Sequence, residues 1–277
     1  MMARGSLTDQ LIAKLRGDLE ELASGARSEH LNDNGRKKLV KEISQAAERL
    51  NVLLADLDPV KRPNSIFDPG NPRTIGYFIA IALTAQPRRK LGSLTRQYRS
   101  GIYALYYNGD FELYRPIRRS ETPIYVGQAA PGSENARTSI EQGLRLAARL
   151  NEHRKTIEHA SSTLRINDFE YRSLVVQTGW ETGAEDYLIR LFRPIWNKET
   201  KIIQGFGKHG DNPTTRKNKV STWDVLHQGR SAAGAGINPA QKTRKEIAAG
   251  LDRHFTKTKS FKTIDQLFEN FVDGLTQ

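Results

Sequence analysis

Between residues 101 and 197 the chain carries, in order, side chains of the types that hydrolysis of a phosphodiester bond requires. That reaction needs an activated water, a charge clamp on the phosphorane-like transition state, and a group that stabilises the leaving alkoxide. Phenols and an imidazole can move protons, a guanidinium can hold phosphate oxygens, and a carboxylate can anchor a hard divalent cation. The candidate catalytic residues are Tyr103, Tyr125, Arg149, His153, Glu185 and Asn197.

Each of these residues also has an ordinary structural interpretation. A lone glutamate on a helix is usually a solvent-exposed charge, and a strand tyrosine usually packs in the core with its hydroxyl at the surface. Arg149 and His153 lie one helical turn apart, which would place a phosphate clamp beside a proton carrier. Tyr103 has a reference pKa of about 10, and a nearby metal and arginine would both favour its phenolate form.

Strand-like and helix-like segments alternate in an order that would position these residues. Apolar and aromatic runs predict strands over 101–107, 111–117, 124–127 and 169–176, and Asn108-Gly109 predicts a hairpin turn because both turn residues favour positive φ. Helical periodicity predicts helices over 138–158 and 181–192, the second ended by Pro194. On the first helix Arg145, Arg149 and His153 recur every four residues and share one side.

The pair of tripeptides Gly101-Ile102-Tyr103 and Tyr125-Val126-Gly127 resembles the signature of the GIY-YIG nuclease superfamily, with Val126 in place of isoleucine. The likeness continues through Arg149, His153, Glu185 and Asn197 and covers about the middle third of the chain. The long gap between the tripeptides, and His153 one turn after Arg149, are most similar to the type II restriction endonuclease branch of that superfamily.

This resemblance implies a mixed α+β fold, with a small central sheet flanked by helices and helical extensions at both ends. It also implies one Mg²⁺, or another divalent cation such as Mn²⁺, on Glu185, and water attack assisted by Tyr103 with His153 as its proton acceptor. Arg149 would stabilise the phosphate, Tyr125 would support the nucleophile, and Asn197 would form hydrogen bonds within the site. The branch reads the palindrome CCGCGG.

Cleavage of both strands of a palindrome implies two sites related by a two-fold axis, hence a homodimer or a dimer of dimers. A restriction role also implies a DNA methyltransferase that protects the host without joining the complex. The terminal helices, which the minimal family core lacks, are the expected contacts between subunits.

The composition agrees with a nucleic-acid partner. The chain has 277 residues and a formal net charge of +12, which attracts polyanions. No cysteine is present, so any metal is held by oxygen or imidazole. No apolar run is long enough to cross a bilayer and no signal-peptide core is visible, which predicts a cytoplasmic protein.

Two groups of cations are candidate DNA-binding residues. Three arginines would lie on the predicted hairpin arm, where they either enter a DNA groove or form a charged outer edge. A second group lies in a glycine-containing loop from residue 205 onward. The basic stretch 86–90 has the same two interpretations, phosphate contact or solvated face. The candidates are Arg115, Arg118, Arg119, Lys208, His209, Arg216, Lys217 and Lys219.

The predicted organisation has three parts. Residues 1–74 form a helical extension and linker, residues 75–230 the nuclease core with its basic loop, and residues 231–277 a linker and C-terminal helices. The N-terminal helices carry leucine stripes that either cover the core or contact a second subunit.

Three other functions remain as alternatives. A structure-specific repair or homing nuclease would cut without a short fixed palindrome and would normally carry a separate DNA-binding domain. A DNA-binding module with an inactive site is disfavoured by the joint presence of Tyr103, Arg149 and Glu185. An RNA-binding protein would explain the charge but not the candidate catalytic residues.

Overall fold

The computed structural model describes residues 6–27, 32–58, 60, 66–207, 220–229, 240 and 242–274. The chain divides into two units, residues 1–67 and residues 68–277. None of the helices in those described ranges is both long and apolar enough to cross a membrane.

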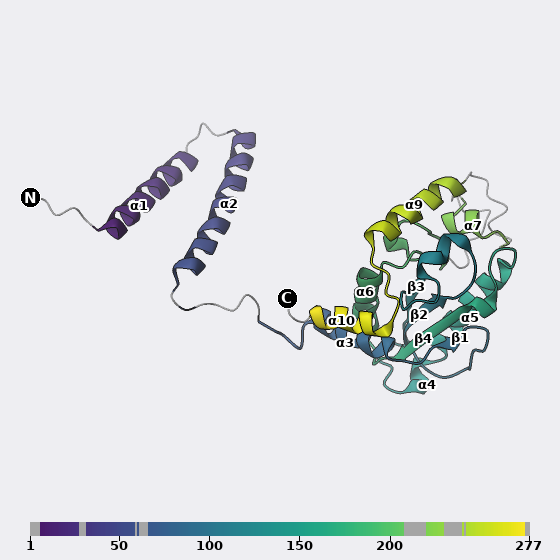
Figure 1. The fold of residues 1–277 in the computed structure, drawn as a ribbon. Helices are drawn as coiled ribbons and strands as arrows, with labels where there is room; N and C mark the ends of the chain where they lie inside the picture. The colour runs from purple at the N-terminus through teal and green to yellow at the C-terminus, as the bar shows by residue number, and fades with distance from the viewer. Residues whose placement is uncertain are drawn as a thin grey trace, which may run out of the picture. The chain divides into compact units, whose positions relative to one another are not determined.

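The first unit contains two helices, α1 (Leu7–Ala26) and α2 (Asp33–Leu57) (Figure 1). Ser6 and Asp9 form a reciprocal capping box at the start of α1. Neither helix contains a buried residue. On α2 the apolar residues follow the four-three spacing of a coiled-coil seam. This α2 seam consists of Leu39, Ile43, Ala46, Leu50, Leu53 and Leu57.

The second unit is built on a four-stranded antiparallel sheet in the order β1-β4-β2-β3. All seven residues of β2 are buried, because this central strand is covered on both faces. The α+β architecture predicted from the sequence is therefore confirmed. The strands are β1 (Arg89–Lys90), β2 (Gly101–Tyr107), β3 (Tyr125–Ala129) and β4 (Phe169–Val175).

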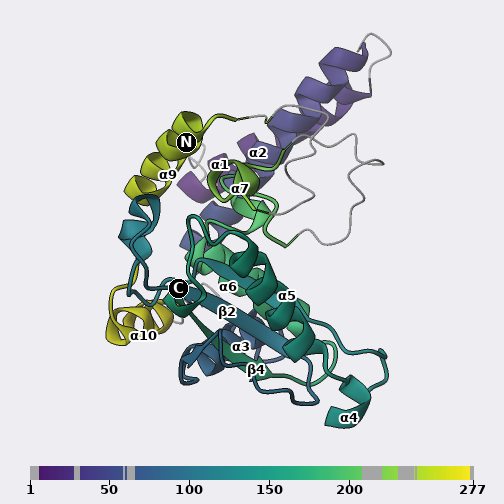
Figure 2. The same cartoon turned by 90° about the vertical axis from the view of Figure 1, so that its right-hand side faces the viewer.

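Helices cover both faces of the sheet and form two hydrophobic clusters (Figure 2). Alternate side chains of β2 enter different clusters, so Tyr103 points to one face and Ile102 to the other. The Tyr103 face is covered by α5 (Arg145–His159), α7 (Thr222–Leu226) and α9 (Arg244–Lys257). The Ile102 face is covered by α3 (Pro72–Thr84), α6 (Glu181–Phe192) and α10 (Ile264–Asp273). The short elements are α4 (Ser139–Gln142), η1 (Glu112–Ile117), η2 (Ile166–Asp168) and η3 (Lys198–Thr200).

Each of the two tripeptides needs its glycine for a different structural reason. Gly101 has φ +147°, and a Cβ at this position would overlap the carbonyl oxygen of Leu174 on the neighbouring strand. Gly127 lies opposite Tyr103 in the β2–β3 register, and a Cβ there would stand 2.5 Å from the Tyr103 hydroxyl oxygen. The first glycine therefore permits strand pairing, and the second leaves room for the phenol.

The predicted hairpin after β2 is wrong. Residues 112–117 form the 3-10 helix η1, and neither Asn108 nor Gly109 has positive φ. Both edges of β2 are already paired, with β3 and with β4, so no edge remains for a hairpin partner. Pro116 also lacks the N–H that a ladder would use. Arg115, Arg118 and Arg119 consequently do not lie on a hairpin arm.

The predicted helix over 138–158 is interrupted at Gly143, which has φ +74° and separates α4 from α5. The helix predicted over 181–192 is confirmed as α6, and the last predicted strand is confirmed as β4, which ends one residue earlier than predicted. Helix α3 begins at Pro72, inside the predicted linker, with Asn71 as its N-cap.

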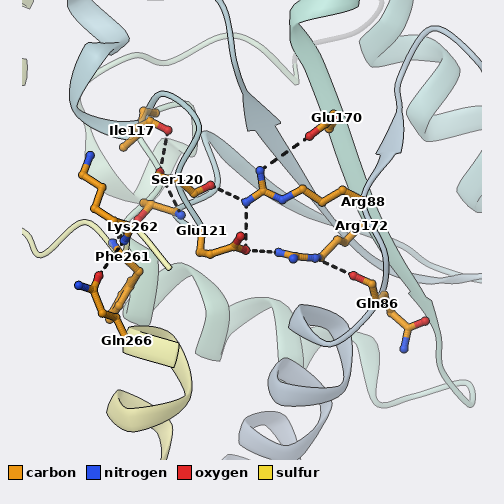
Figure 3. Close-up of polar contacts among 11 residues, drawn as sticks. Gln86, Arg88, Ile117, Ser120, Glu121, Glu170, Arg172, Phe261, Lys262 and Gln266 are labelled. Atoms are coloured by element: carbon orange, nitrogen blue, oxygen red, sulfur yellow. Dashed lines mark hydrogen bonds and ion pairs between the residues drawn. The ribbon is translucent and has the colours of Figure 1, made fainter. Parts of the chain in front are cut away.

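Arg88, in the basic stretch before the core, belongs to an internal ion-pair network (Figure 3). Glu121 lies 3.0 Å from the Arg88 guanidinium and 2.5 Å from that of Arg172. The Arg88 guanidinium also stacks over the Tyr106 ring at 4.0 Å. The backbone N–H of Glu121 donates to the carbonyl of Phe261 at 2.8 Å, so the network joins the sheet to the segment before α10.

Candidate active site

The centre of the candidate site is a hydrogen bond between Tyr103 and His153. The Tyr103 hydroxyl lies 2.7 Å from Nε2 of His153, and both side chains are fully buried. Tyr103 comes from the middle of β2 and His153 from the third turn of α5, which packs on that face of the sheet. A phenol at this position donates to Nε2 when the imidazole proton is on Nδ1, and proton transfer in that tautomer runs from Tyr103 to His153.

Tyr125 joins this pair from the edge strand β3. Its ring centroid lies 6.2 Å from that of Tyr103 and 5.0 Å from that of His153. In the β2–β3 register Tyr103 pairs with Gly127 and Leu105 with Tyr125, so the two phenols are diagonal neighbours on one face. The sheet therefore brings together the tyrosines of the two tripeptides, 22 positions apart in the sequence.

Arg149 lies one helical turn before His153 and is half-exposed at the rim of the site. Its guanidinium forms an ion pair of 2.6 Å with Glu152 on the same helix. Burial raises the pKa of Tyr103 well above its ordinary value, and the charge of Tyr125 adds to this, whereas Arg149 acts to lower it. The expectation that arginine favours the phenolate is right in sign, but the effect of burial on the pKa is larger than that of Arg149.

Glu185 lies on α6, which packs against the edge strand β3. Burial, as the largest cause, and the negative charge of Glu199 together raise the pKa of this carboxyl to about 7. Hydrogen bonds from Gln128 of β3 oppose this shift. The charge of Glu185 in turn acts to raise the pKa of both Tyr103 and Tyr125. The pKa of Tyr125 is raised to about 12, and burial of its side chain is the largest cause.

Asn197 is buried and bonds to the backbone of β3 and not to another candidate residue. Its Oδ1 accepts from the N–H of Val126 at 2.9 Å, and its Nδ2 donates to the carbonyl of Val126 at 2.8 Å. The N–H of Trp196 donates to the carbonyl of Ile124 at 3.1 Å. Residues 196 and 197 thus occupy the outer edge of β3, as a further strand would, and hold Tyr125 in place.

Sequence reasoning missed Phe206, which forms one wall of the site. This fully buried ring stacks on His153, with centroids 4.7 Å apart and planes at 16°, and meets Tyr125 edge-on at 5.1 Å. A single aromatic residue between two glycines, in a loop otherwise polar and basic, was the available signal. Gln128 and Glu199 were also missed, although each lies within three residues of a predicted site residue.

Two of the candidate DNA-binding arginines, Arg115 and Arg118, pair with nearby acidic side chains. Arg115 lies 3.5 Å from Glu112 and Arg118 lies 2.7 Å from Asp110, both as ion pairs. Arg119 has φ +50°, and its backbone N–H donates to the carbonyl of Tyr107. The remaining candidates lie outside the described residues. These are Lys208, His209, Arg216, Lys217 and Lys219.

The carboxylates near the phenols fit a hard divalent cation with few protein ligands. In the part of the chain that the structure describes, no group of three or more His, Cys, Asp or Glu side chains could hold a metal ion. The charge of Glu199 raises the pKa of both Glu185 and Tyr125. A cation of the Mg²⁺ class commonly takes one or two carboxylates and completes its shell with water and substrate phosphate, which suits this donor set.

Comparison with known proteins assigns a family to this arrangement. The model of the Eco29kI GIY-YIG domain matches residues 95–255, which include all six candidate catalytic residues and more than half of the chain. A search of curated proteins gives no match.

Proposed function

Because the chain belongs to the Eco29kI family of GIY-YIG restriction endonucleases, we propose that it hydrolyses both strands of duplex DNA at a short palindrome. The expected target is CCGCGG, the palindrome of the type II branch that the sequence resembles. The observation that supports this most strongly is the hydrogen-bonded pair Tyr103 and His153, with Tyr125 packed against it. Arg149 and Glu185 act electrostatically on both phenols, as a shared reaction centre requires.

In the proposed mechanism a neutral Tyr103 relays a proton. As its oxygen takes a proton from the attacking water, its own proton passes to Nε2 of His153, so no phenolate has to form beforehand. The water oxygen bonds to phosphorus, and the bond to the leaving sugar oxygen breaks. Tyr125 orders the water, and Arg149 holds the non-bridging phosphate oxygens. Asn197 acts on the site indirectly, because it holds the backbone that carries Tyr125.

Glu185 is the proposed anchor for one divalent cation, Mg²⁺ or alternatively Mn²⁺. A cation held there supplies positive charge to the transition state and to the leaving oxygen. Glu199 adds negative charge at the same place, which favours a cation there. The hydrogen bonds from Gln128 fix the orientation of the Glu185 carboxylate against β3.

Double-strand cleavage of a palindrome calls for two copies related by a two-fold axis, as a homodimer or a dimer of dimers. The α2 seam supports a second copy as its occupant, since four-three spacing is the pattern by which helices pair in coiled coils. We assign assembly to residues 1–74, cleavage to residues 75–230, and support of the core to residues 231–277. A cognate methyltransferase in the host is expected, without a place in the complex.

Digestion of plasmid DNA with Mg²⁺ tests the proposal. Discrete fragments whose mapped ends share one palindrome are expected. Nicks or smears would indicate a repair-type nuclease instead, and binding without cleavage would indicate an inactive DNA-binding module.

Glu185→Ala should abolish cleavage, by at least about a hundredfold, and leave DNA binding in the absence of metal largely unchanged. Asp186→Ala is the matched control, because Asp186 is the adjacent, exposed carboxylate on the same helix and should cut normally. Cleavage that survives in Glu185→Ala would show that the metal is anchored elsewhere.

A further inference from the structure

A basic groove lies between α9 and the chain that follows α6. Two adjoining hollows of about 510 and 480 Å³ share Ile202, Gly250 and Arg253 in their linings. The α9 groove is defined as these two hollows together. One wall is α9, and the other is formed by residues 191–193 and 201–202.

Cations dominate the lining of the α9 groove. The single carboxylate among the lining residues is Glu246, and it is engaged by the backbone N–H and hydroxyl of Thr243 in the capping box of α9. None of the lining cations forms an ion pair with an acidic side chain among the described residues. In contrast, Arg115 and Arg118 do. The lining cations are Arg193, Lys201, Lys242, Arg253, Lys257 and Lys259.

Two of these cations are held in an unusual backbone conformation. Arg193 has φ +45° and Lys201 has φ +58°, values in the left-handed region that residues other than glycine rarely adopt. Both therefore occupy turn positions where glycine would be the less strained residue. The turn after α6 and the turn after η3 each direct a cation to the same groove.

Two residues that line the α9 groove follow candidate catalytic residues closely in the sequence. Arg193 follows Glu185 by eight residues along α6 and its C-cap, which corresponds to a rise of about 12 Å. Lys201 follows Asn197 by four residues, across η3. Because a DNA strand advances about 3.4 Å per phosphate, about 12 Å corresponds to three or four phosphates from the scissile bond.

We propose that the α9 groove binds the phosphodiester backbone of the DNA substrate a few nucleotides from the scissile phosphate. This inference rests on the proposed nuclease function and adds a surface that positions the duplex. Lysine and arginine contacts to phosphate give affinity and register without reading bases. The groove should therefore contribute equally to binding of target and unrelated DNA, and its contribution should weaken with salt.

Lys257→Ala and Lys245→Ala form a matched pair for the test, because both are exposed lysines of α9 and only Lys257 lines the groove. DNA affinity is measured by fluorescence anisotropy at several salt concentrations, without divalent metal, on a target duplex and a scrambled duplex. Lys257→Ala should weaken both complexes by the same factor and reduce the slope of log K against log salt by about 0.9, the value for one lost phosphate contact.

Lys245→Ala should keep the wild-type slope. Arg253→Ala provides a second groove variant and should behave as Lys257→Ala does. An unchanged slope in both groove variants, or an equal loss in Lys245→Ala, would overturn the assignment of the groove while the nuclease function stands. Failure of the wild-type protein to bind either duplex would instead remove the proposed function, and the groove assignment with it.

Discussion

Tyr103 is fully buried, which raises the pKa of its phenol, and its hydroxyl lies within hydrogen-bond distance of Nε2 of His153. A neutral phenol is a weak base, but a relay needs only that one proton arrives as another leaves. The neighbours that keep the imidazole oriented toward the phenol are therefore as important as the acid–base pair itself. One such neighbour is the ring of Phe206, which stacks on the His153 ring with centroids 4.7 Å apart.

Phe206→Leu should lower the cleavage rate at saturating DNA by about tenfold or more while DNA affinity stays near the wild-type value. Leucine fills most of the volume but cannot stack on His153, so the imidazole gains freedom to turn away from Tyr103. The rate is measured in single-turnover digestion and the affinity by anisotropy without metal.

Phe192→Leu is the control for loss of packing alone. Phe192 is equally buried and lies in the hydrophobic cluster on the opposite face of the sheet, where it contacts Phe261 edge-on. Both variants should lose roughly 1 to 2 kcal/mol of unfolding free energy in denaturant titrations. Equal cleavage rates in the two variants would mean that Phe206 serves packing alone.

At this scale the sequence predicted which residue types would meet but not how each is used. The convergence of Tyr103, Tyr125 and His153 could be predicted because β2, β3 and α5 were recognisable from hydrophobic pattern and motif. The bonds of Asn197 to the Val126 backbone could not be predicted, since they depend on the path of residues 193–197 after α6 ends. Phe206 was missed because a loop residue has no periodicity from which burial can be inferred.

Among the elements, the error at residues 111–117 shows the limit of local patterns. Asn108-Gly109 between two apolar runs is a strong hairpin signal, but β2 takes its partners from sequence-distant β3 and β4. Gly109 serves a close approach instead, because a Cβ there would overlap the Asp168 carboxylate. Helix α6 was predicted to the residue, since its apolar stripe and the following Pro194 are both local signals.

The ion-pair network that joins the sheet to the C-terminal segment gives a prediction about stability. Glu121→Ala should cost about 2 to 4 kcal/mol of unfolding free energy, because it leaves the largely buried Arg172 and Arg88 without their shared carboxylate. Glu112→Ala is the control, since its pair with Arg115 is exposed and should contribute less than about 0.5 kcal/mol. Urea denaturation measures both. Similar losses in the two variants would show that the network adds no more than a surface pair.

At the scale of the whole molecule, the proposed homodimer requires that the first unit pair with a second copy through the α2 seam. Leu50→Glu combined with Leu53→Glu, in the full chain, should convert the dimer to a monomer in sedimentation equilibrium, since charges at successive seam positions oppose helix pairing. Double-strand cleavage should give way to slow nicking, because each monomer retains one candidate site.

Asn51→Glu provides the comparison, as it adds a charge to an exposed position of α2 outside the seam and should leave the mass unchanged. A dimeric mass in the double variant would remove the α2 seam from the assembly and direct attention to the second unit.

The way the sheet ends limits how two copies can join. On one side, Trp196 and Asn197 take the outward backbone groups of Ile124 and Val126, and on the other the last strand is only two residues long. Strand-to-strand addition across a subunit boundary therefore has almost no template. In the proposed homodimer, the partner chain therefore makes contact through side chains. The distance between the two candidate active sites is then not fixed by a hydrogen-bonded ladder of strands and can suit the duplex.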